Sequence, residues 1–331
     1  VNRQFNLVID EFQEFYNINE SVYSDMQNIW DMYRKRTKMN LIVSGSVKEP
    51  LFGRADNIIK LSAFNLDTLK EIMYDHNPDF SNDDLLALYT FTGGVPKYVE
   101  LFCDNNITTI KKMITFMVSD NSPFTDEVKY LLIEEFGNSY ATYFSILGAI
   151  SGGINTQPKI EAALGSISIG GQIKRLIEDY NIVVRQRPLM QNEGTHTVRY
   201  EIQDNFIRFW FNYFERYRSL IEIKNFDGLR SIITSNYTTY SGIMLERYFK
   251  QKLAESKQFR AIGSWWEHKG TQNEIDIVAL KLEKNRALAI EVKRKKNNFK
   301  PELFAAKVNH LKKKILPKYQ VEMLCLTLED M

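Results

Sequence analysis

Two groups of acidic residues stand at the ends of apolar segments, where side chains that do chemistry are commonly placed. Near the start of the chain, the segment FNLVIDE ends in Asp10 and Glu11. Near the end, Asp276 and Glu291 lie on two apolar runs, and Lys293 follows Glu291 after one residue. Carboxylates are ligands that Mg²⁺ prefers, and a nearby lysine can orient or activate an attacking water. Both groups therefore predict metal-assisted chemistry.

The later group depends on a hairpin. Two alternating apolar runs flank Lys284–Asn285, which we expect to form a two-residue turn. Paired residue numbers would then sum to 569, so that Asp276 faces Lys293 with Glu291 diagonal to it on the same face. A slip of one residue would turn the set to the other face. The alternative is a surface hairpin with ordinary cross-strand ion pairs, because a Glu-x-Lys sequence alone is common.

The earlier group depends on a parallel sheet. Residues 5–9 and 41–45 are short apolar runs, and 21–38 between them has a helical pattern. This strand–helix–strand order is typical of a parallel α/β sheet, and continuous apolar runs favour strands that are buried on both faces.

Ligands of such sheets bind at the carboxyl ends of the strands. There Asp10 is expected to hold Mg²⁺ and Glu11 to orient the attacking water. Ser44 or Ser46 is expected to contact a γ-phosphate, and Arg54 to add positive charge beside it. A nucleotide site of this kind also needs a G-x-x-x-x-G-K-[ST] loop, which cradles the phosphates. No such loop occurs anywhere in the chain, which does not begin with methionine. We therefore expect a fragment of a longer protein, and we expect this fragment to bind ATP weakly or not at all.

The middle of the chain favours two helical regions. A capping box at Ser81–Asp84 begins one helix, Gly93-Gly94 ends it, and Pro96 opens the next. Three helical segments and a hairpin between residues 125 and 203 have the layout of a winged helix-turn-helix. Its candidate DNA-binding residues are Lys174 and Arg175 on the third helix and Arg185 and Arg187 near the wing, with Arg199 beside them.

Charge is unevenly distributed along the chain. The net charge is only +2, but residues 281–318 hold thirteen Lys or Arg against three Glu. This favours a polyanion partner such as DNA, or else a lysine-rich solvated surface. Cys103 and Cys325 are expected to be free thiols, and the four histidines lack metal-ligand spacing. No apolar run is long enough to span a bilayer, so the expected compartment is the cytoplasm.

The N-terminal motifs, taken together, resemble the archaeal-type ATPase family within the AAA+ and STAND group of P-loop proteins. This resemblance rests on the series FNLVIDE, a helix, LIVSGS, FGR and GGVPKY. It implies ATP and Mg²⁺ as cofactors of the full-length protein. The residues that match the family are Asp10 and Glu11 (Walker B acids), Ser44 or Ser46 (sensor), Arg54 (glycine-arginine turn) and Gly93–Pro96 (lid motif).

The C-terminal spacing resembles the PD-(D/E)xK nucleases, which have a restriction-endonuclease-like fold. Asp276, Glu291 and Lys293 match the core pattern, and Glu246 on the preceding helix stands where that group often has another acid. The resemblance implies Asp276, Glu291 and Glu246 as metal ligands and Lys293 as a catalytic residue. Many proteins of this fold bind DNA without cleaving it.

The expected fold class is an α/β multidomain protein with a partial P-loop parallel sheet. Three functions stay open: a nucleotide-regulated DNA-acting protein, a metal-dependent DNA endonuclease with the ATPase part as scaffold, or a non-enzymatic DNA-binding or interaction protein. An oligomer is compatible with each. The expected domains are 1–60 (C-terminal half of the P-loop ATPase core), 61–124 (helical lid), 125–203 (winged helix), 204–240 (aromatic helical brace) and 241–331 (nuclease-like domain).

Overall fold

A computed structural model of the 331-residue chain describes residues 4–12, 15, 18–19, 21–45, 57–191, 197–267, 270 and 272–331. The chain forms two units, residues 1–61 with 178–180, and residues 62–177 with 181–331. Both contain helices and strands, so the protein is a mixed α/β multidomain protein. Ser46 and Arg54, two predicted nucleotide-binding residues, lie outside the described residues.

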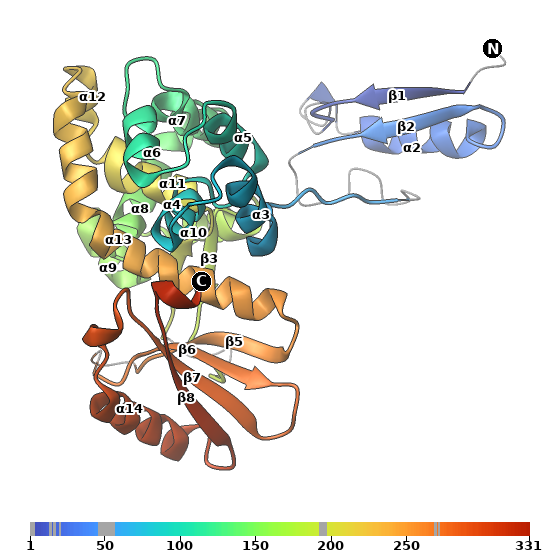
Figure 1. Ribbon diagram of the computed structural model, residues 1–331. Coiled ribbons are helices and arrows are strands. Elements are labelled where there is room, and N and C mark those ends of the chain that lie inside the picture. The colour runs from blue at the N-terminus through green and yellow to red at the C-terminus, as the bar shows by residue number, and fades with distance from the viewer. Residues whose placement is uncertain are drawn as a thin grey trace. The chain divides into compact units, whose positions relative to one another are not determined.

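The first unit has the predicted strand–helix–strand order. Strands β1 (Phe5–Ile9) and β2 (Met39–Val43) pair in parallel, and α2 (Val22–Tyr33) connects them (Figure 1). The expectation that both strands are buried on both faces is wrong: Val8 is 61% exposed and Ile42 is 47% exposed. The physical reason is that this sheet has only two strands within the described residues, too few to cover their apolar side chains.

The second unit begins with helices whose ends follow local sequence signals. Ser81 forms the predicted capping box with Asp84 at the start of α4 (Asn82–Thr92), Gly93 ends that helix with φ +59°, and Pro96 opens α5 (Pro96–Asp104). The neighbouring helices are α3 (Leu66–His76), α6 (Ile110–Met117) and α7 (Pro123–Phe136), followed by a 3₁₀ turn over Gly137–Ser139.

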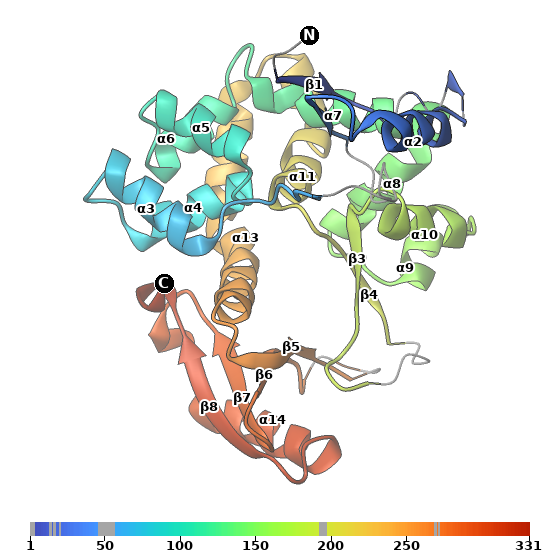
Figure 2. The same ribbon diagram turned by 90° about the vertical axis from the view of Figure 1, so that its right-hand side faces the viewer.

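Three helices and a hairpin follow, in the expected order. They are α8 (Tyr140–Ser151), α9 (Gln157–Ala163), α10 (Gly170–Glu178), β3 (Val183–Gln186) and β4 (Arg199–Ile202). The two strands are antiparallel, and Val183 pairs with Ile202. In Figure 2 the hairpin reaches down to the four-stranded sheet.

The first part of the expected aromatic helical brace is divided into three pieces. These are α11 (Asn205–Trp210), a π-helical turn over Phe211–Glu215 and α12 (Arg218–Glu222). Most of their large aromatic side chains lie in the core. Trp210 is fully buried, and its indole N–H donates to the carbonyl of Thr125 at 2.9 Å.

A 30-residue helix, α13 (Phe226–Glu255), leads into a four-stranded sheet and continues without a break across residue 240. The elements of this region are β5 (Phe259–Trp265), β6 (Ile275–Lys281), β7 (Arg286–Val292), a 3₁₀ turn (Lys296–Asn298), α14 (Pro301–Lys314), β8 (Gln320–Leu326) and a final 3₁₀ turn (Leu328–Asp330). The sheet order is β5-β6-β7-β8, with β7 and β8 parallel and the other pairs antiparallel. Figure 1 shows α14 lying along the sheet, and its buried residues Phe304, Val308 and Leu311 pack against Val278 and Ala289 in one core.

Both cysteines are free and half-buried. In the part of the chain that the structure describes, no helix combines the length and the apolar character that crossing a bilayer requires.

Candidate functional site

Asp276 and Glu291 meet on one face of the β6–β7 hairpin. Ile277 pairs with Ile290, so the register places Asp276 directly opposite Glu291 and paired numbers sum to 567. The predicted sum of 569 is therefore wrong, because residues 282–285 make a four-residue connection in which Asn285 has φ +60°. The shift is two residues, and since side chains alternate with a period of two, the acids keep the expected face.

Lys293 joins this pair. Its ammonium lies 2.9 Å from a carboxylate oxygen of Glu291 and 3.9 Å from one of Asp276. The same Asp276 oxygen accepts a hydrogen bond of 2.8 Å from the backbone N–H of Val292, which fixes the carboxylate against the neighbouring strand. The carboxylates of Asp276 and Glu291 therefore share the positive charge of Lys293, and these are the three residues that the sequence predicts to converge.

Burial perturbs the titration of these groups. Desolvation raises the pKa of Asp276, and the charge of Glu291 raises it further. Glu246 on α13 is near enough to be affected: burial, then the charge of Asp276, raises its pKa to about 7. Burial opposes the charge of Lys293, but its contacts with Glu291 and Asp276 prevail and raise its pKa. Strongly perturbed groups of this kind are more frequent at functional sites than elsewhere.

The structure adds Lys307, which sequence reasoning missed. This residue of α14 places its ammonium 3.4 Å from one carboxylate oxygen of Glu291 and 3.5 Å from the other. It is one lysine among many in a basic segment, and only the packing of α14 on the sheet distinguishes it. No local signal identifies it.

The donor set fits one divalent cation held by few protein ligands. Within the described ranges, no group of three or more His, Cys, Asp or Glu residues is arranged to hold a metal. Asp276 and Glu291 nevertheless share the Lys293 ammonium, so their oxygens converge on a position where a cation is favourable. Mg²⁺ commonly takes one or two carboxylates and keeps several waters, which is compatible with this pair.

At the other predicted site, Asp10 and Ser44 come together at the carboxyl ends of β1 and β2. The hydroxyl of Ser44 donates to Asp10, and the backbone N–H of Glu11 donates to the same oxygen at 3.0 Å. These two hydrogen bonds, that from Ser44 first, lower the pKa of Asp10. Glu11 has φ +47°, a left-handed conformation that is uncommon for a residue other than glycine.

The predicted DNA-binding residues lie in different surroundings. Lys174 and Arg175 on α10 and Arg185 on β3 are exposed, whereas Arg187 is partly buried. Arg199 on β4 instead forms a two-pronged ion pair with Glu274.

The hairpin that carries Arg199 is attached to the C-terminal sheet. The Arg199 guanidinium lies 4.4 Å from the ring centroid of Trp266, and the backbone N–H of Leu189 donates to the carbonyl of Ser264 at 2.9 Å. Trp265 and Trp266 are both buried, so they pack in the core. This end of the hairpin is therefore held by the sheet.

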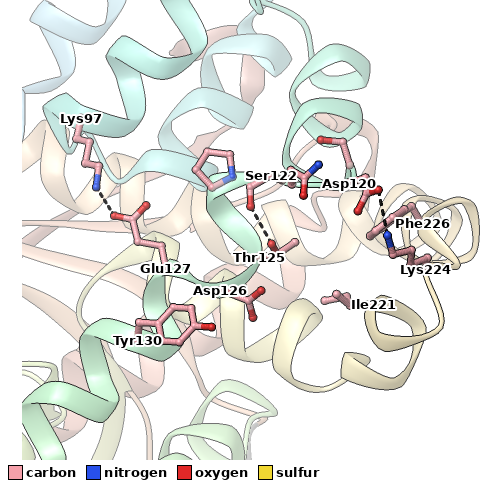
Figure 3. A pocket seen from close by; sticks show the side chains of 13 residues that line it. Lys97, Asp120, Ser122, Thr125, Asp126, Glu127, Tyr130, Ile221, Lys224 and Phe226 are labelled. Carbon is pink, nitrogen blue, oxygen red and sulfur yellow. Dashed lines mark hydrogen bonds and ion pairs between the residues drawn. The ribbon is translucent and has the colours of Figure 1, made fainter.

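A pocket of about 670 Å³ in the second unit, beside α7 and the start of α13, is lined by none of the candidate site residues (Figure 3). Lys97 points to Glu127, at 2.6 Å, and Lys224 points to Asp120, at 3.2 Å. The third acid that lines the pocket is Asp126, whose carboxylate lies 3.4 Å from the guanidinium of Arg218, a residue outside the pocket lining. Each of these acids is paired, so the pocket has no evident catalytic group.

The fold is that of a mixed α/β protein, and its acidic residues converge on one face of the C-terminal sheet. Comparison with known proteins identifies the family. A family model described as "Archaea bacterial proteins of unknown function" (DUF234) matches residues 210–306, a range that includes Glu246, Asp276, Glu291 and Lys293. An uncharacterized protein of Methanocaldococcus jannaschii is 33% identical over an alignment of 311 positions, which covers 87% of this chain and 67% of that protein. The chain therefore belongs to the same family as this archaeal protein. No solved structure matches the chain.

Proposed function

We propose that the C-terminal sheet carries a Mg²⁺-dependent phosphodiesterase site of the PD-(D/E)xK nuclease type, and that its substrate is DNA. The observation that supports this most is the convergence of Asp276, Glu291 and Lys293 on one face of β6 and β7. Glu246 provides a fourth titratable group beside them. The basic segment from Lys281 to Lys318 supplies the positive charge that a polyanionic substrate requires.

In this proposal, Asp276 and Glu291 hold the cation, which supplies charge stabilisation to the phosphate. Lys293 orients a water molecule for in-line attack on phosphorus. Hydrolysis adds that water across one P–O bond, leaving a phosphate monoester on one DNA end and a hydroxyl on the other. The attachment of the β3–β4 hairpin to β5 keeps the site adjacent to the preceding domain.

The experiment is cleavage of supercoiled, linear and branched DNA in Mg²⁺ or Mn²⁺. Wild-type protein is expected to nick or cut at least one form. Asp276→Asn, Glu291→Gln and Lys293→Met are expected to abolish the reaction. Lys112→Met, which removes an exposed lysine of α6 outside the basic segment, is expected to retain it. If no DNA form is cleaved with either metal, the enzymatic function is refuted and a DNA-binding role remains.

A second function has its own observation. We propose that β1, α2 and β2 belong to a nucleotide-binding sheet of the ATPase family named above, because the hydrogen bond from Ser44 to Asp10 lies at the carboxyl ends of two parallel strands. Residues 1–331 contain no Walker A loop, so calorimetry with Mg²⁺–ATP is expected to give no micromolar binding by this chain. A longer form in which such a loop precedes Val1 is expected to bind ATP.

The region from α8 to β4 is proposed to be a winged helix that contacts the DNA backbone through Lys174 and Arg175. Support comes from the order of its elements and the exposure of both side chains on α10. If they neutralise phosphates, the affinity for a DNA duplex falls steeply with salt, and Lys174→Ala reduces the slope of log K against log [salt] by about one. An unchanged slope would leave the winged helix as a protein-contact module.

A further inference from the structure

Glu291 is contacted by two ammonium groups from different elements. Lys293, which directly follows the end of β7, places its ammonium 2.9 Å from one carboxylate oxygen of Glu291. Lys307, on α14, lies at 3.4 and 3.5 Å from the two oxygens. Glu291 is only 8% exposed, so both lysines offset the cost of burying its charge.

A divalent cation on Glu291 changes this balance. The cation takes up carboxylate oxygens and repels both ammonium groups, since like charges a few ångströms apart in a partly buried site interact strongly. Lys293 also lies 3.9 Å from Asp276 and is attracted by the charge of Glu246, a carboxylate that is not one of the two proposed to hold the cation. Within the described residues, Lys307 forms its ion pair with Glu291 at the longer distance of 3.4 Å, its charge acts on Asp276 only as a minor influence, and its side chain is 23% exposed. Lys307 is therefore the lysine that cation binding releases.

We propose that Lys307 is a phosphate-binding residue of this site: it pairs with Glu291 before the cation arrives and contacts a DNA phosphate afterwards. The proposal rests on the function proposed above and adds a residue to it. An ammonium released beside a bound cation is well placed for a phosphate oxygen, because the phosphate brings the negative charge that both cations need. Binding of cation and DNA would thus favour one another.

The proposal makes two opposite predictions for Lys307→Met. Calorimetric titration with Mn²⁺ in the absence of DNA should give about tenfold tighter binding than for wild-type protein, because a repelling charge is gone. Affinity for a short DNA duplex, measured by fluorescence anisotropy with Ca²⁺ in place of Mg²⁺, should fall about three- to tenfold, as expected for one phosphate contact. With EDTA instead of Ca²⁺, wild type and Lys307→Met should bind DNA about equally.

The matched control is Lys313→Met on the same helix, which removes the same charge from an exposed position. Its effect on DNA affinity should be equal with Ca²⁺ and with EDTA. Lys307→Arg retains the charge and should restore the Ca²⁺-dependent DNA affinity. Thermal melting of each variant establishes that it is folded before binding is measured.

Four results would overturn the proposal. A loss of DNA affinity in Lys307→Met that is the same with EDTA would make Lys307 ordinary surface charge. Weaker Mn²⁺ binding by this variant would mean that Lys307 only supports Glu291. If wild-type protein neither binds Mn²⁺ nor cleaves DNA, both this proposal and the proposed function fail. If it does both but Lys307→Met binds Mn²⁺ and DNA like wild type, only the role of Lys307 fails.

Discussion

The guanidinium of Arg294 lies 2.6 Å from a carboxylate oxygen of Asp83, which joins the end of β7 to the N-terminus of α4. Arg294 directly follows Lys293, is 14% exposed, and lies 5.6 Å from the ring centroid of Tyr237. A second nitrogen of the guanidinium donates to the hydroxyl of Ser241 on α13. One arginine thus connects the candidate site with two helices of the preceding region.

Loss of this contact should destabilise the second unit. Asp83→Asn leaves a largely buried guanidinium without its charged partner, and we expect the free energy of unfolding to fall by about 1–2 kcal/mol. Denaturant unfolding measures it. The control is Glu283→Gln, which breaks the exposed ion pair with Arg286 and should change stability by less than about 0.5 kcal/mol. Equal effects of the two substitutions would contradict the importance of the Arg294 contact.

The pH dependence of stability should reflect Glu246. Its pKa is raised from 4.5 to about 7 in the folded protein, so between these values the folded state binds a proton that the unfolded state has lost. The contribution of Glu246 to the free energy of unfolding is therefore fully present below about pH 4.5 and is lost as the pH rises through 7. Glu246→Gln removes this term, so thermal melting should show the variant gaining stability relative to wild type from pH 5 to pH 8.

The same comparison tests the metal. Saturating Mg²⁺ at pH 8 should stabilise wild type more than Glu246→Gln if this carboxylate faces the cation.

For the pH prediction without metal, a difference in stability between the two proteins that does not change with pH would contradict it. Such a result would show that Glu246 titrates normally and that its burial has little energetic effect.

Close packing at Gly94 should make that position intolerant of a side chain. A Cβ there would lie 2.8 Å from the carbonyl oxygen of Phe64, and φ is +79°. We expect Gly94→Ala to cost at least about 1–3 kcal/mol in unfolding free energy. Gly171→Ala, on α10 with open space and no positive φ, should be neutral or stabilising. A wild-type melting temperature for Gly94→Ala would mean that residues 63–64 can move away.

The attached hairpin predicts a separation between stability and DNA binding. Arg199→Ala removes the ion pair with Glu274 and the contact with Trp266, so we expect a loss of about 1–3 kcal/mol in stability. It should leave the salt dependence of duplex binding unchanged, whereas Lys174→Ala should reduce it. The reverse result would place Arg199, rather than α10, against DNA.

Features with local causes could be predicted from the sequence. The capping box at Ser81, the helix end at Gly93 and the start at Pro96 each depend on neighbouring residues, and all three are present. The meeting of Asp276 and Glu291 on one face also followed from strand alternation. The pairing register of β6 and β7 could not be predicted in this way. The turn is a four-residue loop in which Asn285 has a positive φ, and the residue pattern does not specify that loop.

Contacts that bring distant elements together were beyond such reasoning. Lys307 meets Glu291 only because Phe304, Val308 and Leu311 press α14 onto the sheet. Arg199 was expected near DNA, and nothing close to it in sequence indicates Glu274 as its partner. The exposure of β1 and β2 was missed for a similar reason: an apolar run predicts a strand, but not how many strands lie beside it.

The most direct test of the proposed nuclease site is the rate at which supercoiled plasmid is nicked in Mg²⁺ by wild-type protein and by Lys293→Met. The substitution removes the group proposed to orient water but leaves both carboxylates, so Mn²⁺ binding by calorimetry should persist while the nicking rate falls at least about 100-fold. Nicking by Lys293→Met at the wild-type rate, or no nicking by wild-type protein, would contradict the account.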